Sequence, residues 1–208
     1  MNKLKKYDRK FLDTGHKFIA GVDEAGRGPL AGPVVAAAVI FDSKTVIEEV
    51  NDSKKVPEKV REQLYDIIIE HAVNYGVGIV DEKTIDEINI LQATMMAMKE
   101  AINNLSITPD LILIDGNRTF ESKLETLSVV KGDSLSFSIA AASIIAKVTR
   151  DRIMRIASEE FPEYLWHKNK GYGTKEHIAA IKDHGPTSFH RISFLGNILD
   201  QDILLENI

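Results

Sequence analysis

Three short apolar runs in this chain each end at an acidic residue close to glycine. The runs and the acids that follow them are 18–22 with Asp23 and Glu24, 111–114 with Asp115, and 127–131 with Asp133. Runs of this length are typical of strands, and the unbroken run at 111–114 is typical of a strand buried on both faces of a sheet. Open α/β sheets place ligands beyond the carboxyl ends of their strands. We therefore expect the four carboxylates to converge on one site.

The remaining pattern alternates strands with helices. Further strands are expected over 33–41 and 75–80, and helices over 57–73, 81–103 and 137–158. The inward face of the second helix is expected to carry Ile88, Leu91, Met95, Met98 and Ile102. The third helix begins with small side chains, which let its axis approach a sheet closely, and short helices and loops follow it. This order of elements predicts an α/β or mixed domain.

Composition limits the class of protein. A chain of 208 residues with 44% hydrophobic residues can bury a core in one domain. The absence of cysteine excludes disulfides and thiolate metal sites, but a hard cation can still bind to carboxylate oxygen. The N-terminus lacks the apolar region of a secretory signal, and the apolar stretch 33–41 is too short to span a bilayer. We expect a cytoplasmic protein without membrane contact. The lack of heptads also favours a monomer.

The charge balance bears on the partner. A net charge of −5 argues mildly against nucleic acid. Basic residues nevertheless cluster at Lys54 and Lys55, at Arg150, Arg152 and Arg155, and over 167–170. Such clusters could contact phosphate groups and make binding sensitive to salt, although a solvated surface is the commoner role of each lysine taken alone.

Carboxylates that lie close together repel one another unless cations neutralise them. Two Mg²⁺ or Mn²⁺ ions roughly 4 Å apart would do so and would support in-line phosphoryl chemistry. Asp23 and Glu24 carry a geometric condition, because neighbouring residues of a regular strand point to opposite faces. They can share a site only if the strand bends or ends between them. The alternative is that these acids are solvated loop residues or helix caps.

Gly26, Arg27 and Gly28 form a loop that suits an anion. Its backbone N–H groups can face a phosphate while Arg27 adds positive charge. A dinucleotide-binding fingerprint is the competing interpretation, but the spacing to Gly32 misses that pattern by one residue. The fingerprint also requires a helix next, whereas residues 33–40 read as a strand. We therefore reject a nicotinamide-dependent oxidoreductase. A tight hairpin turn is compatible with anion binding.

The segment 23–34 resembles the signature of the type 2 ribonuclease H family, ribonuclease HII. Further motifs match the family in order: NDSKK at 51–55, LIDGN at 113–117, KGD at 131–133, SIAAASIIAKVTRD at 138–151, GYGT at 171–174 and HRISF at 190–194. These matches extend from residue 18 to about residue 195. The resemblance is therefore specific and covers nearly the whole chain.

The resemblance implies a ribonuclease H-like fold, with a mixed five-stranded sheet flanked by helices and a helical C-terminal region. It implies a single catalytic domain over 1–208, divided into an N-terminal extension over 1–16, a core over 17–158 and a helical region over 159–208. The implied activity is that of an endonuclease that cuts the RNA strand of RNA/DNA hybrids. The family also nicks 5′ of single ribonucleotides in duplex DNA, as ribonucleotide excision repair requires, and leaves 3′-hydroxyl and 5′-phosphate ends.

The resemblance also assigns roles to residues. The catalytic and metal-binding positions are Asp23, Glu24, Asp115 and Asp133, with Mg²⁺ or Mn²⁺ as the cofactor. The positions that bind the substrate are Gly26, Arg27 and Gly28 around the ribonucleotide, Tyr172 against the sugar on the DNA side of the junction, and Lys54 and Lys55 on backbone phosphate. A closely apposed loop can read a 2′-hydroxyl, because that group both donates and accepts hydrogen bonds.

Two alternatives remain within this reading. Type 3 enzymes carry an added N-terminal domain and a glutamate at the fourth acidic position, whereas this chain has Asp133 there and about seventeen residues before its first strand. A non-catalytic nucleic-acid-binding module would gain nothing from carboxylates beside phosphates. The six histidines show no metal-ligand spacing, so we expect them to be structural or surface residues.

Overall fold

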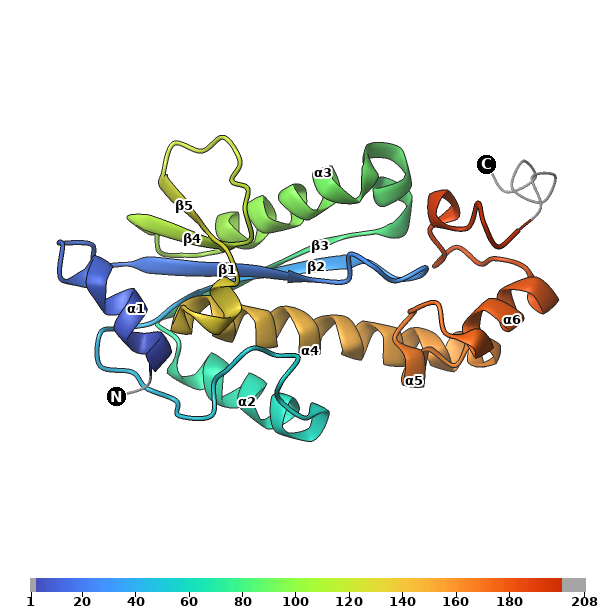
Figure 1. The fold of residues 1–208 in the computed structure, drawn as a ribbon, viewed down its shortest axis with the longest axis horizontal. Coiled ribbons are helices and arrows are strands. Elements are labelled where there is room, and N and C mark those ends of the chain that lie inside the picture. The colour runs from blue at the N-terminus through green and yellow to red at the C-terminus, as the bar shows by residue number, and fades with distance from the viewer. Residues whose placement is uncertain (1–2, 200–208) are drawn as a thin grey trace.

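The computed structural model describes residues 3–199 and contains a five-stranded sheet between layers of helices (Figure 1). The strands are β1 (Ile19–Ala25), β2 (Val34–Ile40), β3 (Asn74–Val80), β4 (Leu111–Asp115) and β5 (Glu125–Val129). The helices are α1 (Lys3–Leu12), α2 (Glu58–His71), α3 (Glu82–Asn103), α4 (Phe137–Glu160), α5 (Trp166–Asn169) and α6 (Lys175–His184). The structure also contains short 3₁₀ turns, η1 (Gly132–Ser134) before α4, η2 (Pro162–Tyr164) before α5 and η3 (Ile192–Phe194) after α6.

The sheet is mixed, with the strand order β3-β2-β1-β4-β5. β2 pairs antiparallel with β1 and with β3, whereas β4 pairs parallel with β1 and with β5. The predicted mixed five-stranded sheet is therefore confirmed, and each predicted strand and long helix occurs with its ends shifted by a few residues. Because β1 and β4 run parallel as neighbours, their carboxyl ends lie side by side.

Helices cover both faces of the sheet (Figure 1). Alternating side chains of the strands pack against these two helical layers. On β2, Ala36 and Ala38 belong to the core beneath α3, whereas Ala37 and Val39 belong to the core shared with α2 and α4. This division follows from the two-residue period of a strand. Successive side chains of a strand therefore pack alternately against the two helical layers.

Gly21 brings α4 directly onto β1. A Cβ atom at this position would lie 2.2 Å from the backbone carbon of Ser138 and 2.3 Å from the backbone nitrogen of Ile139. No side chain fits in that space, so only glycine lets the N-terminal end of α4 contact the central strand. The helix therefore does approach the sheet closely, and the glycine of the strand is what permits it.

Helix α3 departs from the predicted regular helix. Asn89 has φ 67° and ψ 161°, which interrupts the helix, and its side chain accepts hydrogen bonds from the N–H groups of Leu91 and Gln92. The part after the break starts afresh with Asn89 as its cap. The predicted inward face was therefore only partly right. Met98 and Ile102 are buried, and the half-buried Ile88 and Met95 pack against the same core, whereas Leu91 is half-buried without joining that core. The buried face also includes Ile85, Ala93, Ala97 and Ala101.

The chain on either side of the sheet is tied to α4. In α1, the buried Asp8 accepts hydrogen bonds from the N–H (2.9 Å) and the hydroxyl (2.7 Å) of Ser138. At the other end, Trp166 and Leu195 share a buried cluster with Ala31 of the glycine loop. The proposed division at residue 158 stays a prediction, since α4 continues to Glu160 and residues 200–208 lie outside the described part. Within 3–199, no helix combines the length and apolar character needed to cross a membrane.

Candidate metal and nucleic-acid site

Strand pairing places Asp23 beside Asp115. The parallel register pairs Gly21 with Leu113 and Val22 with Ile114, so one further step aligns the two aspartates. Both side chains lie on the α4 face of the sheet, because Gly21 and Leu113, two residues earlier, lie on that face. Two acidic residues that are 92 positions apart in sequence thus become neighbours.

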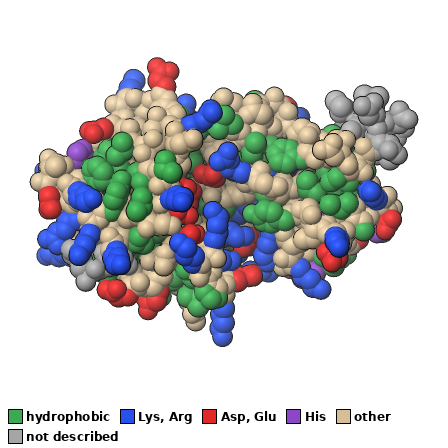
Figure 2. All heavy atoms as spheres, in the orientation of Figure 1, with side chains coloured by type: hydrophobic (Ala, Val, Ile, Leu, Met, Phe, Trp, Pro, Cys, Tyr) green, Lys and Arg blue, Asp and Glu red, His purple; other side chains and the backbone are tan. Residues whose placement is uncertain are grey.

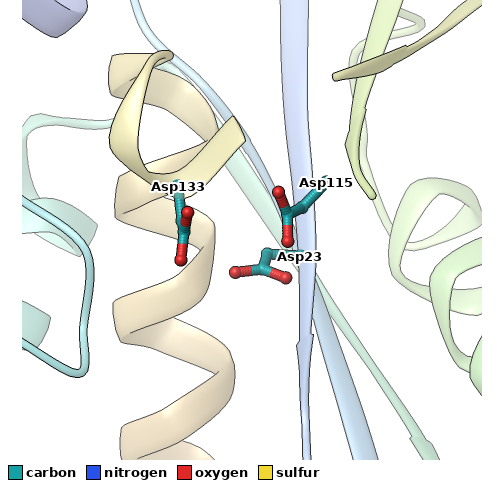
Figure 3. Close-up of side chains that lie close together, drawn as sticks. All are labelled: Asp23, Asp115 and Asp133. Atoms are coloured by element: carbon teal, nitrogen blue, oxygen red, sulfur yellow. The ribbon is translucent and has the colours of Figure 1, made fainter. Parts of the chain in front are cut away.

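Asp133 reaches the same place by another route. It lies in η1, after Lys131 has adopted a left-handed conformation (φ 58°), and therefore not directly at a strand end as predicted. The Gly132 N–H donates to Asp115 Oδ1 at 2.6 Å, which fixes η1 against β4. Carboxylate oxygens of Asp23, Asp115 and Asp133 all lie within 4.8 Å of one another. Figure 3 shows the three side chains turned toward a common space between β1, β4 and the start of α4.

Burial and like charge make this cluster unfavourable for carboxylates alone. Burial, with repulsion from Glu24 and Asp115, raises the pKa of Asp23 well above its usual value. Burial and the nearby Asp115 likewise raise the pKa of Asp133. The Glu24 N–H donates to Asp23 Oδ1 at 2.7 Å, which opposes the effect only in part. Oxygen donors that repel one another at this spacing suit a hard divalent cation.

Glu24 lies apart from the other three acids. β1 continues through Ala25, so no strand end separates Asp23 from Glu24, and Glu24 points to the α3 face. There it borders a pocket of about 190 Å³ together with Arg27, Asp115 and Arg118. Its oxygen Oε1 lies 3.3 Å from Arg27 Nη1. The structure thus brings three of the four predicted acids into one cluster. Glu24 lies outside that cluster and lines the neighbouring pocket, which Asp115 also borders.

The segment 51–55 forms one border of the acidic cluster. Ser53 Oγ lies 2.6 Å from Ser143 Oγ, and the Ser143 hydroxyl opposes the rise in the pKa of Asp23. The positive charge of Lys54 acts on both Glu24 and Asp133, where it opposes the rise of their pKa values. Lys55 is largely exposed and contacts Asp52 Oδ2 and Ser134 Oγ, each at 3.3 Å. Both lysines therefore lie next to the cluster. On the face in Figure 2, Lys and Arg side chains surround acidic ones near the middle.

The glycine loop and Tyr172 lie together, as the resemblance implies. Gly26 has φ 102°, which a side chain would strain, so glycine is needed there. A Cβ atom at Gly28 would lie 3.8 Å from Cε1 of Tyr172, whose side chain is exposed. The Tyr172 carbonyl oxygen accepts a hydrogen bond from Nδ1 of His177 at 2.9 Å. The loop and the ring thus form one surface, and a buried histidine supports the ring's backbone.

Sequence reasoning missed the residues that hold this surface from within. Arg150 appeared as part of a surface cluster with Arg152 and Arg155, but it is buried, and its guanidinium group bonds to backbone carbonyl groups. Arg152 and Arg155 instead pair with Glu62 of α2. No spacing in the sequence marks Arg150 as different from its neighbours. The Arg191 side chain, within the HRISF motif, is also buried, and the matching motif was its only signal.

Two further residues differ from expectation. Lys170, considered as a phosphate contact, is buried and bonds through Nζ to the His167 carbonyl oxygen (2.7 Å) and to Glu58 (3.3 Å). Ser143, which the motifs did not mark as a site residue, acts on the acidic cluster through the pKa of Asp23. The sequence did not reveal this position, because it depends on which face of α4 turns toward the sheet and on the close contact of α4 with Gly21.

Comparison with known proteins agrees with the geometry. Residues 20–196 match the family model described as Ribonuclease HII. A protein named Ribonuclease HII from Caldicellulosiruptor bescii is 54% identical over 192 residues, which cover 92% of this chain and 93% of that protein. A protein of the same name from Clostridioides difficile is 54% identical over 193 residues, covering 93% and 76%. The crystal structure of ribonuclease H2 from Pyrococcus horikoshii has a TM-score of 0.71 at 29% identity, covering 85% and 93%.

Proposed function

We propose that this chain, which belongs to the ribonuclease HII family and is a ribonuclease H endonuclease, cuts the RNA strand of RNA/DNA hybrids. It also nicks duplex DNA on the 5′ side of a single embedded ribonucleotide. Hydrolysis adds water across the P–O3′ bond, so the products carry a 3′-hydroxyl and a 5′-phosphate. The single observation that carries the proposal is the convergence of Asp23, Asp115 and Asp133 within 4.8 Å.

The residues present fit a pair of divalent cations, Mg²⁺ or Mn²⁺. The fit rests on three converging carboxylates, two of which have raised pKa values, and on Glu24 at the edge of the cluster. When bound, such cations activate water and stabilise the charge on the leaving 3′ oxygen. Asp23 and Asp115 would hold the centre of the site, with Asp133 and Glu24 on either side.

The chain's own residues orient the substrate. Lys54 lies close enough to Glu24 and Asp133 to attract a phosphate group to the cluster. Arg27, which lies beside Glu24, adds a second positively charged side chain within the glycine loop. The N–H groups of that loop face a phosphate or a sugar more closely than side chains could, and Tyr172 offers a flat apolar surface to a sugar without a 2′-hydroxyl. Because these groups contact sugar and phosphate, cleavage should depend little on base sequence.

The proposal extends to context. The chain acts as one catalytic domain over 1–208, as a monomer in the cytoplasm, with hybrid or ribonucleotide-containing duplexes as its partners. A non-catalytic module is the second candidate function. The acidic cluster argues against it, because buried carboxylates beside a phosphate site weaken binding unless cations are present.

A nicking assay tests the function. A labelled DNA duplex with one ribonucleotide should be cut once, 5′ of the ribonucleotide, only when Mg²⁺ or Mn²⁺ is present. Asp115→Asn should lower the rate at least about a hundredfold, since it removes the carboxylate that joins the cluster to the pocket of Glu24. Binding of the uncut duplex should persist in this variant. Cleavage in excess chelator, or normal turnover by Asp115→Asn, would contradict the proposal.

A further inference from the structure

One buried side chain holds the loop between β1 and β2 from beneath. Arg191 is fully buried, and its guanidinium group donates hydrogen bonds to four carbonyl groups of that loop. The accepting oxygens belong to Gly26 at 2.6 Å, Arg27 at 3.2 Å, Pro29 at 2.9 Å and Gly32 at 2.5 and 2.9 Å. A planar guanidinium offers five N–H donors in a fixed fork, so a lysine could not serve all these oxygens.

The inward carbonyl groups determine where the N–H groups point. In a trans peptide, the C=O of one residue and the N–H of the next point in opposite directions. The inward carbonyl groups of Gly26 and Arg27 therefore turn the N–H groups of Arg27 and Gly28 outward. Within residues 3–199, neither of these N–H groups has a hydrogen-bond partner. The loop thus presents two free donors, and Gly28 lies next to the Tyr172 ring.

A second buried arginine joins this loop to the turn that carries Tyr172. Arg150 donates hydrogen bonds, each of 2.9 Å, to the carbonyl oxygens of Ala31, Pro33 and Lys170. The next carbonyl oxygen, that of Gly171, accepts a hydrogen bond of 2.8 Å from the Leu30 N–H. The loop and the turn at 170–172 therefore share one internal support.

Glu82, the first residue of α3, supplies the opposite charge. Burial lowers the pKa of Arg191 to about 9, and the nearby Arg150 adds repulsion. Burial raises the pKa of Glu82 to about 7, while attraction to Arg191 and Arg150 opposes that rise. Glu82 Oε1 is buried without a hydrogen-bond partner. Buried charges of this kind often stabilise a fold less than apolar residues would, so a contribution to stability alone explains the cluster poorly.

We propose that Arg191 is a positioning residue for substrate recognition, which turns the N–H groups of Arg27 and Gly28 toward the nucleic acid. Arg150 joins the loop to the Tyr172 turn, and Glu82 supplies a nearby negative charge. Arg191 is fully buried, so it acts through the loop and touches no substrate. The inference rests on the proposed function, because the partner of those N–H groups would be the sugar–phosphate backbone of the duplex.

Arg191→Lys tests this role, because it keeps the charge and removes the fork. On the duplex with one ribonucleotide, KM should rise about tenfold while kcat changes less than about threefold, since the variant loses substrate binding and keeps the acidic cluster. Arg155→Lys, the same change at a side chain that bonds to Glu62 on the surface, is the matched control and should leave both constants unchanged.

Hydrogen exchange gives a readout that does not depend on activity. In the free Arg191→Lys protein, the amides of Leu30, Ala31 and Gly32 should exchange faster, because their bonds to Gly171 and Phe189 depend on the loop's position. The amides of β4 should keep their wild-type protection. Equal acceleration in β4 would mean general destabilisation and would overturn the positioning role.

The outcomes separate this inference from the proposed function. A wild-type protein that fails to nick refutes the function, while the exchange experiment still tests the loop. An active wild type together with an unchanged KM in Arg191→Lys overturns the inference. Should Arg191→Lys not fold, Glu82→Gln replaces it. That variant removes the opposing charge and should raise KM about threefold, and an unchanged KM would likewise overturn the inference.

Discussion

At the scale of the residue, Asp23 is held where a carboxylate is least stable by itself. It is 5% exposed and lies beside Asp115 and Glu24. Its pKa in the folded protein is therefore raised above the ordinary value of 3.8. A carboxyl group with a raised pKa stabilises the folded state fully below its unfolded pKa, and this contribution is lost as pH rises. The contribution of Asp23 to the stability of the cation-free protein should thus decline from about pH 4 upward.

Asp23→Asn should therefore stabilise the cation-free protein at pH 7 while it abolishes cleavage. The amide oxygen can still accept the Glu24 N–H, and the repulsion disappears. We expect a gain of about 1 kcal/mol, or roughly 2–4 °C in Tm, that shrinks toward pH 4. Thermal unfolding in chelator at both pH values measures the gain. A lower Tm for Asp23→Asn at pH 7 would show that repulsion is not the dominant effect.

At the scale of the element, the contact between α4 and β1 decides where the acidic cluster forms. Gly21 lets the backbone of Ser138 and Ile139 lie against β1, and Asp23 follows two residues later on the same face. Ser143, one turn further along α4, acts on Asp23 and opposes the rise in its pKa. The position of α4 on the strand thus sets the surroundings of the Asp23 carboxylate.

Gly21→Ala should consequently cost both stability and activity. Its Cβ would lie 2.2 Å from backbone atoms that cannot rotate away, so α4 must shift. We expect the free energy of unfolding to fall by about 2 kcal/mol or more, with reduced cleavage in the remaining folded protein. Gly196→Ala is the control, because no atom lies within 4 Å of its Cβ position. Urea unfolding of the two variants compares them, and equal stabilities would contradict the packing argument.

At the scale of the whole molecule, a buried histidine pair links the C-terminal segment to the turn that carries Tyr172. Trp166 Nε1 donates to Nε2 of His177 at 3.0 Å, and Nε2 of His190 lies 3.1 Å from the same atom. The Thr187 N–H donates to Nδ1 of His190 at 2.9 Å, so this histidine must stay neutral to accept it. Burial, with the neighbouring His177, lowers the pKa of His190 to about 3.

The protein should therefore lose stability in mild acid. The unfolded state binds a proton near pH 6.5 and the folded state only near pH 3, so His190 favours folding above pH 6.5 and loses this contribution as pH falls. The loss should approach about 1.4 kcal/mol per pH unit. Urea unfolding at several pH values between 7 and 5 measures how steeply the free energy of unfolding falls with pH. This dependence on pH should be weaker for His190→Gln than for wild type. His184→Gln should keep the wild-type dependence on pH. If His190→Gln also kept it, the buried pair would be excluded as the cause.

Local order along the chain was predictable because it depends on nearest neighbours. Hydrophobic period and run length located the strands and long helices, and the acids at strand ends identified Asp23, Asp115 and Asp133 as partners. The break at Asn89 was not predictable, since helical spacing continues across it and only its backbone angles reveal the interruption. Glu24 is separated from the cluster because neighbouring side chains of a strand point to opposite faces. The sequence showed this condition, but it left open whether the strand ends between Asp23 and Glu24.

Residue types and their spacing therefore established the family, the kind of sheet and the carboxylate chemistry, because those properties reside in motifs of a few adjacent residues. Which charges become buried was settled by the packed molecule. Arg150, Arg152 and Arg155 look alike in the sequence, yet the rotation of α4 turns the first into the interior and leaves the other two on the surface with Glu62. Likewise, Arg191 reaches the carbonyl groups of the loop between β1 and β2 only after distant segments have packed together. Burial and partnership of a side chain are properties of the assembled core, which no short stretch of sequence contains.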